Sequence, residues 1–284
     1  MHGVMRSGQA MPVGALPSSS CDVADLYVPA CVSAEARAVL TLRSGWARRW
    51  TTSWRLSGTQ VVCAVQDLAL MQVVGAEPVR RFTWRADQRH RPGLQFLVST
   101  GRHHGFESLA EQQLLLALDF AGEVVDVLSQ PFRLRFTTAG EWREHIPDFL
   151  VIARGGRWML DVRPAERIGP DDLVRFAAAG EAALAAGWRY GVVAGWRPHV
   201  LTTLDTLASQ RRPLADPLGT QPELLEAAAH GPLPFAELVA ATSYPAVARA
   251  HALHLIWHRS LAMDLAQPLG DRTPIWPVHA GGDR

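Results

Sequence analysis

The amino-acid sequence predicts an α/β protein. Within residues 105–200, a helical leucine pattern is followed by three short apolar segments typical of strands, an alanine-rich helix and a last apolar strand. Residues 201–284 carry mainly helical patterns with short breaks. The chain has 284 residues, of which 48% are hydrophobic and 19% charged, so it can bury a sizeable core. We therefore expect a core with the order helix, three antiparallel strands, helix, strand, followed by a mainly α-helical C-terminal domain.

Local patterns place the elements of this core. Leu114, Leu115 and Leu118 recur at the spacing of one helix face. The adjacent glycines Gly155 and Gly156 separate two apolar runs and predict a β-hairpin. In chain order, we expect a helix over residues 107–120, strands over 132–136, 147–153 and 158–162, a helix over 170–186 and a strand over 190–194.

Three further segments complete the chain. Residues 1–33 are rich in glycine, proline, serine and small apolar residues without a period, which predicts a loosely ordered leader. Residues 34–104 form a basic N-terminal region, with a short β-rich or mixed segment expected over 46–75. Residues 201–284 form the C-terminal domain, whose three helices and hairpin-like tail have the order of a winged-helix domain. These helices are expected over 222–229, 235–241 and 245–265, and the tail contains an apolar run over 273–276.

The charge and cysteine content narrows the class of protein. The formal net charge is +1, from 28 basic and 27 acidic residues, which excludes a histone-like polycation or an acidic tail protein. No apolar run approaches the roughly 18 residues that span a bilayer, and we expect neither a signal peptide nor a membrane association. The three cysteines are not spaced like metal ligands. We expect them to be reduced thiols, as in a cytoplasmic protein. All 28 basic residues are arginine, so a site that usually employs lysine must employ another residue here.

Residues 79–104 form a basic stretch with a single acid, Asp87. Phe82 and Trp84 lie between its arginines, and arginine with aromatic residues is typical of a surface that contacts a phosphate backbone. A solvated connector that happens to be rich in arginine explains this composition equally well. The candidate DNA-binding residues are Arg80, Arg81, Arg85, Arg89, Arg91 and Arg102.

Three acids lie where apolar residues are expected. Glu111 falls on the leucine stripe of the first helix, where a carboxylate is costly unless it is paired, holds a metal or reaches water at the edge of the stripe. If Gly155 and Gly156 form a two-residue turn, Asp148 faces Arg163 and Asp161 faces a leucine. Asp148, Asp161 and Arg163 then share one face at the open end of the hairpin.

This grouping predicts a site for phosphodiester hydrolysis. Two neighbouring carboxylates raise each other's pKa unless a cation lies between them, and a hard divalent metal with oxygen ligands is the natural occupant. We expect Glu111, Asp148 and Asp161 to hold one or two Mg²⁺ or Mn²⁺ ions, which activate a bound water and neutralise charge on the phosphate. Arg163 is expected to position the attacking water or the scissile phosphate.

The same residues carry a resemblance to a known family. Four motifs occur in order: Phe106-Glu107-Ser108-Leu109-Ala110-Glu111, Gln130-Pro131-Phe132, His145-Ile146-Pro147-Asp148-Phe149 and Leu160-Asp161-Val162-Arg163-Pro164. This series resembles the restriction-endonuclease-like core written PD-(D/E)xK, and more narrowly the TnsA-like endonuclease subunit of heteromeric transposases. The resemblance extends over roughly residues 78–277 and implies a winged-helix-like C-terminal domain.

The resemblance also implies a function and partners. Glu111 would be the catalytic glutamate, Asp148 the metal-binding aspartate and Asp161 the second acid. Proteins of this family cut the non-transferred strand of double-stranded DNA at the 5′ ends of the transposon. A DDE-type transposase subunit (TnsB-like) acts at the 3′ ends, and an AAA+ ATPase regulator (TnsC-like) docks on the C-terminal domain.

One position departs from the family pattern. The motif ends in lysine, whereas this chain has Arg163, which supplies charge but cannot release a proton near neutral pH. Three alternatives therefore remain open: a restriction-type or repair-type nuclease that acts alone, a catalytically inactive DNA-binding scaffold with a degenerate nuclease fold, and a winged-helix regulator.

Overall fold

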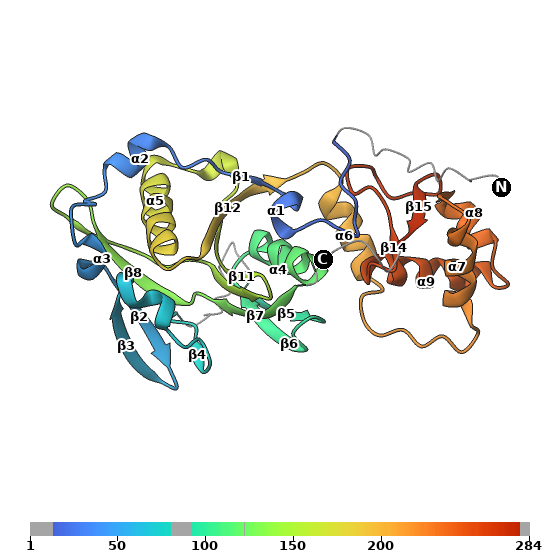
Figure 1. The fold of residues 1–284 in the computed structure, drawn as a ribbon, viewed down its shortest axis with the longest axis horizontal. Helices are drawn as coiled ribbons and strands as arrows, with labels where there is room; N and C mark the ends of the chain where they lie inside the picture. Colours follow the sequence, from blue (N-terminus) through green and yellow to red (C-terminus); the bar gives the residue numbers. More distant parts are fainter. Residues whose placement is uncertain (1–13, 81–91, 122, 279–284) are drawn as a thin grey trace, which may run out of the picture. The chain divides into compact units, whose positions relative to one another are not determined.

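The computed structural model describes residues 14–80, 92–121 and 123–278 (Figure 1). The chain divides into two compact units, one formed by Asp22–Trp196 and the other by the residues up to Cys21 together with Arg197–Arg284. The fold combines sheets and helices, which confirms the expected α/β class. No helix in the described ranges has both the length and the apolar character required to cross a membrane.

A five-stranded sheet with one helix on each face forms the centre of the unit Asp22–Trp196. Strand β11 runs parallel to β12, and the other pairs are antiparallel. Helix α4 (Leu109–Ala121) packs with Phe149, Val151 and Leu160, whereas helix α5 (Pro170–Ala185) packs with the alternate residues of the same strands (Figure 1). In spatial order the strands are β1 (Tyr27–Pro29), β12 (Arg189–Trp196), β11 (Gly156–Val162), β10 (Phe149–Ala153) and β7 (Val124–Ser129).

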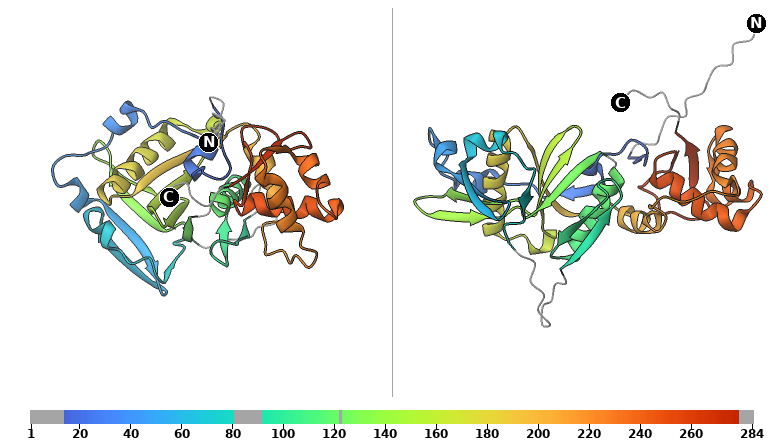
Figure 2. Two further views of the ribbon diagram at one scale, coloured as in Figure 1. Left: turned by 45° about the vertical axis from the view of Figure 1, so that its right-hand side comes forward. Right: turned by 90° about the horizontal axis from the view of Figure 1, so that it is seen from below.

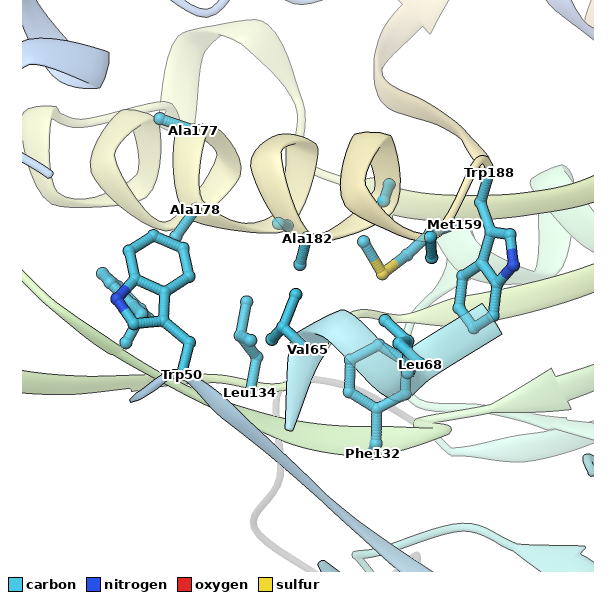
Figure 3. Packing of buried hydrophobic residues seen from close by; sticks show 14 of the residues in the cluster. Trp50, Val65, Leu68, Phe132, Leu134, Met159, Ala177, Ala178, Ala182 and Trp188 are labelled. Atoms are coloured by element: carbon cyan, nitrogen blue, oxygen red, sulfur yellow. The ribbon is translucent and has the colours of Figure 1, made fainter. Parts of the chain in front are cut away.

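A second sheet packs against the buried face of α5. Its path is β3-β2-β8-β9, and a short strand, β4, pairs with β2. Figure 2 shows the β2–β3 hairpin, coloured blue, at the edge of the unit. Phe132 and Leu134 of β8, together with Trp50 just before β2, meet the alanines of α5 in a buried cluster (Figure 3). The strands are β2 (Thr51–Leu56), β3 (Thr59–Ala64), β4 (Ala76–Glu77), β8 (Phe132–Thr137) and β9 (Trp142–His145).

The expected strand over residues 132–136 exists as β8, but it lies in this second sheet. The third antiparallel strand of the central sheet is β7, which the sequence analysis missed. Short elements complete the unit: the β5–β6 hairpin (Gly93–Leu97 and Arg102–Phe106), helices α2 (Ala34–Ala38) and α3 (Trp46–Arg49), and the 3₁₀ helices η1 (Val65–Leu70) and η2 (Ala165–Arg167).

Residues 22–33 differ from the loosely ordered leader that the sequence predicted. They contribute helix α1 (Val23–Leu26) and strand β1, which pairs with β12. Asp22 and Asp25 form a capping box that stabilises the start of α1, and Tyr27 is buried. Composition alone missed this order, because the ladder partner of β1 lies far along the chain.

The C-terminal residues fold into helices and a small sheet. The helix expected over 245–265 ends at Trp257, because Arg259 adopts a φ of +57° and the chain then enters a strand. The sheet has the order β13-β15-β14 and is antiparallel. Its elements are α6 (Val200–Ala208), α7 (Thr220–Ala229), β13 (Leu233–Pro234), α8 (Phe235–Ala240), α9 (Pro245–Trp257), β14 (Leu261–Ala262) and β15 (Pro274–Pro277).

Candidate active site

The β10–β11 hairpin has a different register from the one predicted by its glycines. Ala153 pairs with Gly156, so Arg154 and Gly155 form the two-residue turn. Gly156 has a φ of +124°, a conformation that other residues rarely adopt. The expected and observed registers differ by two residues, and the side-chain period of a strand is also two. Each residue therefore keeps its predicted face although its partner changes.

Asp148 and Asp161 lie at the open end of this hairpin. The ladder ends at the pair of Phe149 and Leu160, and Asp148 directly precedes Phe149 while Asp161 directly follows Leu160. The prediction that Asp148 lies opposite Arg163 is wrong, because the turn begins earlier than expected. The charge of Asp161 acts on the Asp148 carboxyl in the observed register.

Glu111 joins the two aspartates from the first turn of α4. The pKa of Asp148 is raised well above its ordinary value, because the carboxyl is desolvated and lies near the negative charges of Asp161 and Glu111. The backbone N–H of Val162 donates a hydrogen bond of 2.7 Å to Asp148 Oδ2, which opposes this shift. Asp148 thus lies near both of the other carboxylates that the sequence grouped with it.

Glu111 also has a structural role at the start of α4. Its Oε1 accepts a hydrogen bond of 2.9 Å from Ser108 Oγ, and its Oε2 accepts one of 2.8 Å from the backbone N–H of Glu107. Ser108 Oγ in turn accepts from the Glu111 N–H, which is half of a capping box. Burial is the largest cause of a raised Glu111 pKa, and the charge of Arg80 opposes it.

Two residues to which the sequence analysis gave no role form hydrogen bonds with the Asp161 carboxylate. His145 Nε2 lies 3.0 Å from both carboxylate oxygens, and the Tyr190 hydroxyl donates to Oδ2 at 2.7 Å. Asp161 is only 2% exposed. Burial and the nearby charge of Asp161 raise the pKa of Tyr190 well above its ordinary value, so its hydroxyl stays protonated and donates.

Helix α5 leaves room for the Tyr190 ring. A Cβ atom added to Gly180 would lie 3.3 Å from Tyr190 Cδ1, which is tighter than ordinary van der Waals contact. Glycine inside a helix costs about 1 kcal/mol relative to alanine. The ring therefore gives a physical reason for a glycine in the middle of an otherwise alanine-rich helix.

Arg163 contacts the start of α5. Its Nε lies 3.3 Å from Asp172 Oδ2 and donates to the Arg167 carbonyl oxygen at 3.2 Å. The side chain is 45% exposed, so the guanidinium remains accessible to solvent. Its charged partner in the described structure is thus Asp172, and Arg163 itself directly follows the last residue of β11.

Two arginines of the basic stretch have acidic partners. Arg80 pairs with Glu107, next to the start of α4, and Arg102 pairs with Asp126 on β7. Arg80 therefore lies near the acid cluster, which agrees with its effect on the Glu111 pKa. The other four predicted DNA-binding residues, Arg81, Arg85, Arg89 and Arg91, lie outside the described residues.

The donor set is suited to a hard divalent cation. Within the described ranges, no three His, Cys, Asp or Glu side chains are grouped closely enough to coordinate one ion as they stand. The three neighbouring carboxylates nevertheless offer the oxygen ligands that Mg²⁺ and Mn²⁺ prefer. Burial is the largest cause of the raised Asp148 pKa, and a cation among the carboxylates would relieve the repulsion that adds to it.

Comparison with known proteins assigns no family to this chain. Neither a protein-family model nor a curated protein sequence matches it. The functional interpretation therefore depends on the convergence of Glu111, Asp148 and Asp161 and on the residues that hold them.

Proposed function

We propose that this protein is a metal-dependent DNA endonuclease subunit of a heteromeric transposase, which hydrolyses phosphodiester bonds at the 5′ ends of the transposon. The observation that carries the proposal is the position of the buried Asp148 carboxyl, which accepts from the Val162 N–H and lies near the charges of both Asp161, on β11, and Glu111, on α4. Like charges at a partly buried site destabilise a fold, so their presence together calls for a ligand of opposite charge.

The order of elements supports the proposal. Helix α4, strands β7, β10 and β11, helix α5 and the parallel strand β12 occur in the order of a restriction-endonuclease-like core, with β8 and β9 of the second sheet inserted between β7 and β10. In the C-terminal unit, α7, β13, α8, α9, β14 and β15 follow the winged-helix order. Similarity of fold supports a function only by analogy. The proposal therefore depends on the acidic residues, and the topology is additional support.

The chemistry follows from the residues at the site. Asp148, Asp161 and Glu111 would hold Mg²⁺ or Mn²⁺, which when bound lowers the pKa of a water and neutralises phosphate charge. The Val162 N–H fixes one oxygen of Asp148, and Ser108 fixes one oxygen of Glu111. The exposed guanidinium of Arg163 supplies a positive charge for the phosphate and does not serve as a base.

The proposed partners follow from the resemblance. Double-stranded DNA at the transposon ends would contact the basic stretch, a TnsB-like DDE-type subunit would cut the other strand, and a TnsC-like AAA+ ATPase would dock on the C-terminal unit. A chain with a net charge of +1 is expected to bind DNA modestly by itself. We therefore assign the choice of DNA site to the partners.

Calorimetric titration of Mn²⁺, with and without a short DNA duplex, tests the proposal. We expect the wild-type protein to bind Mn²⁺ and Glu111→Gln to bind it at least tenfold more weakly, because the variant removes one negative ligand. Glu123→Gln, at an exposed glutamate before β7, is the matched control and should bind as the wild type does. Failure of the wild type to bind, even with DNA present, would overturn the nuclease proposal.

One set of observations favours a second candidate, the inactive DNA-binding scaffold. Glu111 caps α4, Asp161 accepts hydrogen bonds from His145 and Tyr190, and Arg163 pairs with Asp172. In a site that has lost its catalytic activity, the acids would be kept only because these contacts stabilise the fold. The Mn²⁺ titration separates the two functions, since a scaffold would not bind the ion at these residues.

Substitutions of Arg163 test its part in the proposed reaction. We expect Arg163→Lys to keep or raise Mn²⁺-dependent strand cleavage, and Arg163→Ala to lower it roughly tenfold or more, because each tenfold corresponds to about 1.4 kcal/mol of charge stabilisation. Cleavage of a labelled duplex measures the effect. Loss of the partly exposed ion pair to Asp172 should cost at most about 1 kcal/mol of stability. Equal cleavage by all three proteins would exclude a catalytic role for this position.

A further inference from the structure

Asp161 is held between the two sheets of its unit. Tyr190, on β12, approaches it from the neighbouring strand of the central sheet, where Met159 is the ladder partner of Tyr190. His145 approaches from the end of β9, in the second sheet. The side chains of Asp161 and His145 are 2% and 11% exposed, so water competes little for these contacts.

Both partners are themselves fixed in place. The Tyr190 ring packs against Gly180 of α5, where a methyl group would lie 3.3 Å from Cδ1. The His145 ring meets the Phe176 ring of the same helix edge to face, with centroids 6.2 Å apart and planes at 76°. Helix α5 therefore positions both donors that reach the carboxylate.

The hydrogen bonds leave limited capacity on Asp161. A carboxylate offers about four acceptor positions. His145 Nε2 contacts both oxygens and Tyr190 contacts Oδ2, so most of the remaining capacity is on Oδ1. The two donors thus determine the plane of the carboxylate and the oxygen that stays available.

We propose that Tyr190 and His145 are positioning residues, which hold Asp161 so that its Oδ1 faces the divalent cation shared with Asp148. This inference rests on the proposed metal-dependent function. It assigns a role to Tyr190, which lies outside the four motifs, and to His145, whose motif gave it no role, and it makes α5 part of the site. Partners that orient a ligating carboxylate typically change metal affinity by about 10–100-fold when they are removed.

The Mn²⁺ affinity of the full chain, measured by calorimetry, tests the proposal. Tyr190→Phe removes only the hydroxyl that donates to Asp161, and we expect it to weaken Mn²⁺ binding about 10–100-fold. The matched control is Tyr244→Phe, which removes a tyrosine hydroxyl from the other unit, just before α9, and should leave the affinity unchanged. Equal affinity of Tyr190→Phe and the wild type would overturn the proposal.

A double-mutant cycle with Gly180 separates positioning from a general structural effect. Gly180→Ala should displace the Tyr190 ring and weaken Mn²⁺ binding at least threefold, although alanine favours the helix. In the Tyr190→Phe background, the same change should have no further effect on affinity. Additive effects would overturn the positioning role.

Absence of Mn²⁺ binding by the wild type would overturn the proposed function as well. Mn²⁺ binding that is unchanged by substitution of Tyr190 would overturn this inference alone.

Discussion

Replacing Asp148 with asparagine is expected to reduce Mn²⁺-dependent cleavage at least about 100-fold and to stabilise the metal-free protein. The change removes the central charge of three neighbouring carboxylates, which a cation must otherwise neutralise. Asparagine can still accept the hydrogen bond from the Val162 N–H, so the hairpin keeps its register. Cleavage of a labelled duplex and urea unfolding in the presence of a chelator measure the two effects.

The stability of the metal-free wild type should also depend on pH at this residue. The folded pKa of Asp148 lies above its unfolded value of about 3.9, so between these two values the folded state binds more protons than the unfolded state. The contribution of Asp148 to the free energy of unfolding is therefore favourable at low pH, and it declines as pH rises from about 4 through the folded pKa. The raised pKa of Glu111 acts in the same direction and persists in the variant.

We expect Asp148→Asn to reduce the decline in stability over this pH range without abolishing it. Asp205→Asn, at an exposed aspartate of α6, is the control and should follow the wild-type pH profile. Identical profiles for the wild type and Asp148→Asn would contradict the desolvated, repelled state assigned to the Asp148 carboxyl. Saturating Mn²⁺ should restore the wild-type stability at neutral pH, because a ligand that binds the folded state stabilises it.

Local periodicity was sufficient to predict α4, β10 and β11, whereas β7 and β9 were missed. The leucine stripe placed α4, and the glycine pair placed the β10–β11 hairpin, because both signals involve residues near one another in the chain. The register failed because either neighbouring glycine could take the positive φ, and only Gly156 does. The grouping of Asp148 and Asp161 survived this error, since a shift of two residues preserves the face.

The hydrogen bonds from His145 and Tyr190 to Asp161 could not be predicted in the same way. His145 and Tyr190 lie 16 and 29 residues from Asp161, on strands β9 and β12, which belong to different sheets. Their meeting depends on how the second sheet packs on α5, which no local pattern encodes. The only signal in the sequence was indirect: a glycine inside the alanine-rich helix, which indicates that a neighbour needs the space.

The second large effect is expected at Phe132, whose loss should destabilise the unit more than any surface change near the site. Phe132 is fully buried, and its ring lies 4.7 Å from the Trp54 ring between centroids. Replacing it with alanine should lower the free energy of unfolding by about 3–5 kcal/mol, because the substitution removes buried apolar surface and leaves a cavity. Urea unfolding measures the loss.

Phe132 also connects the core to the acids. It begins β8 directly after Gln130-Pro131, and Gln130 has a φ of +48°. The Gln130 N–H donates to the Asp148 carbonyl oxygen at 2.7 Å, so packing of Phe132 helps to hold a strained residue against the site. Phe132→Ala should therefore weaken Mn²⁺ binding even under conditions in which the variant is fully folded.

The neighbouring residue provides the control for this link. Arg133 is exposed on the opposite face of β8, and Arg133→Ala should change stability by less than about 1 kcal/mol, because only a surface ion pair to Glu144 is lost. A similar loss in both variants would show that β8 tolerates truncation on either face. A large stability loss at Phe132 with unchanged Mn²⁺ affinity would instead separate the core from the site, since the strained turn would then keep its geometry without the ring.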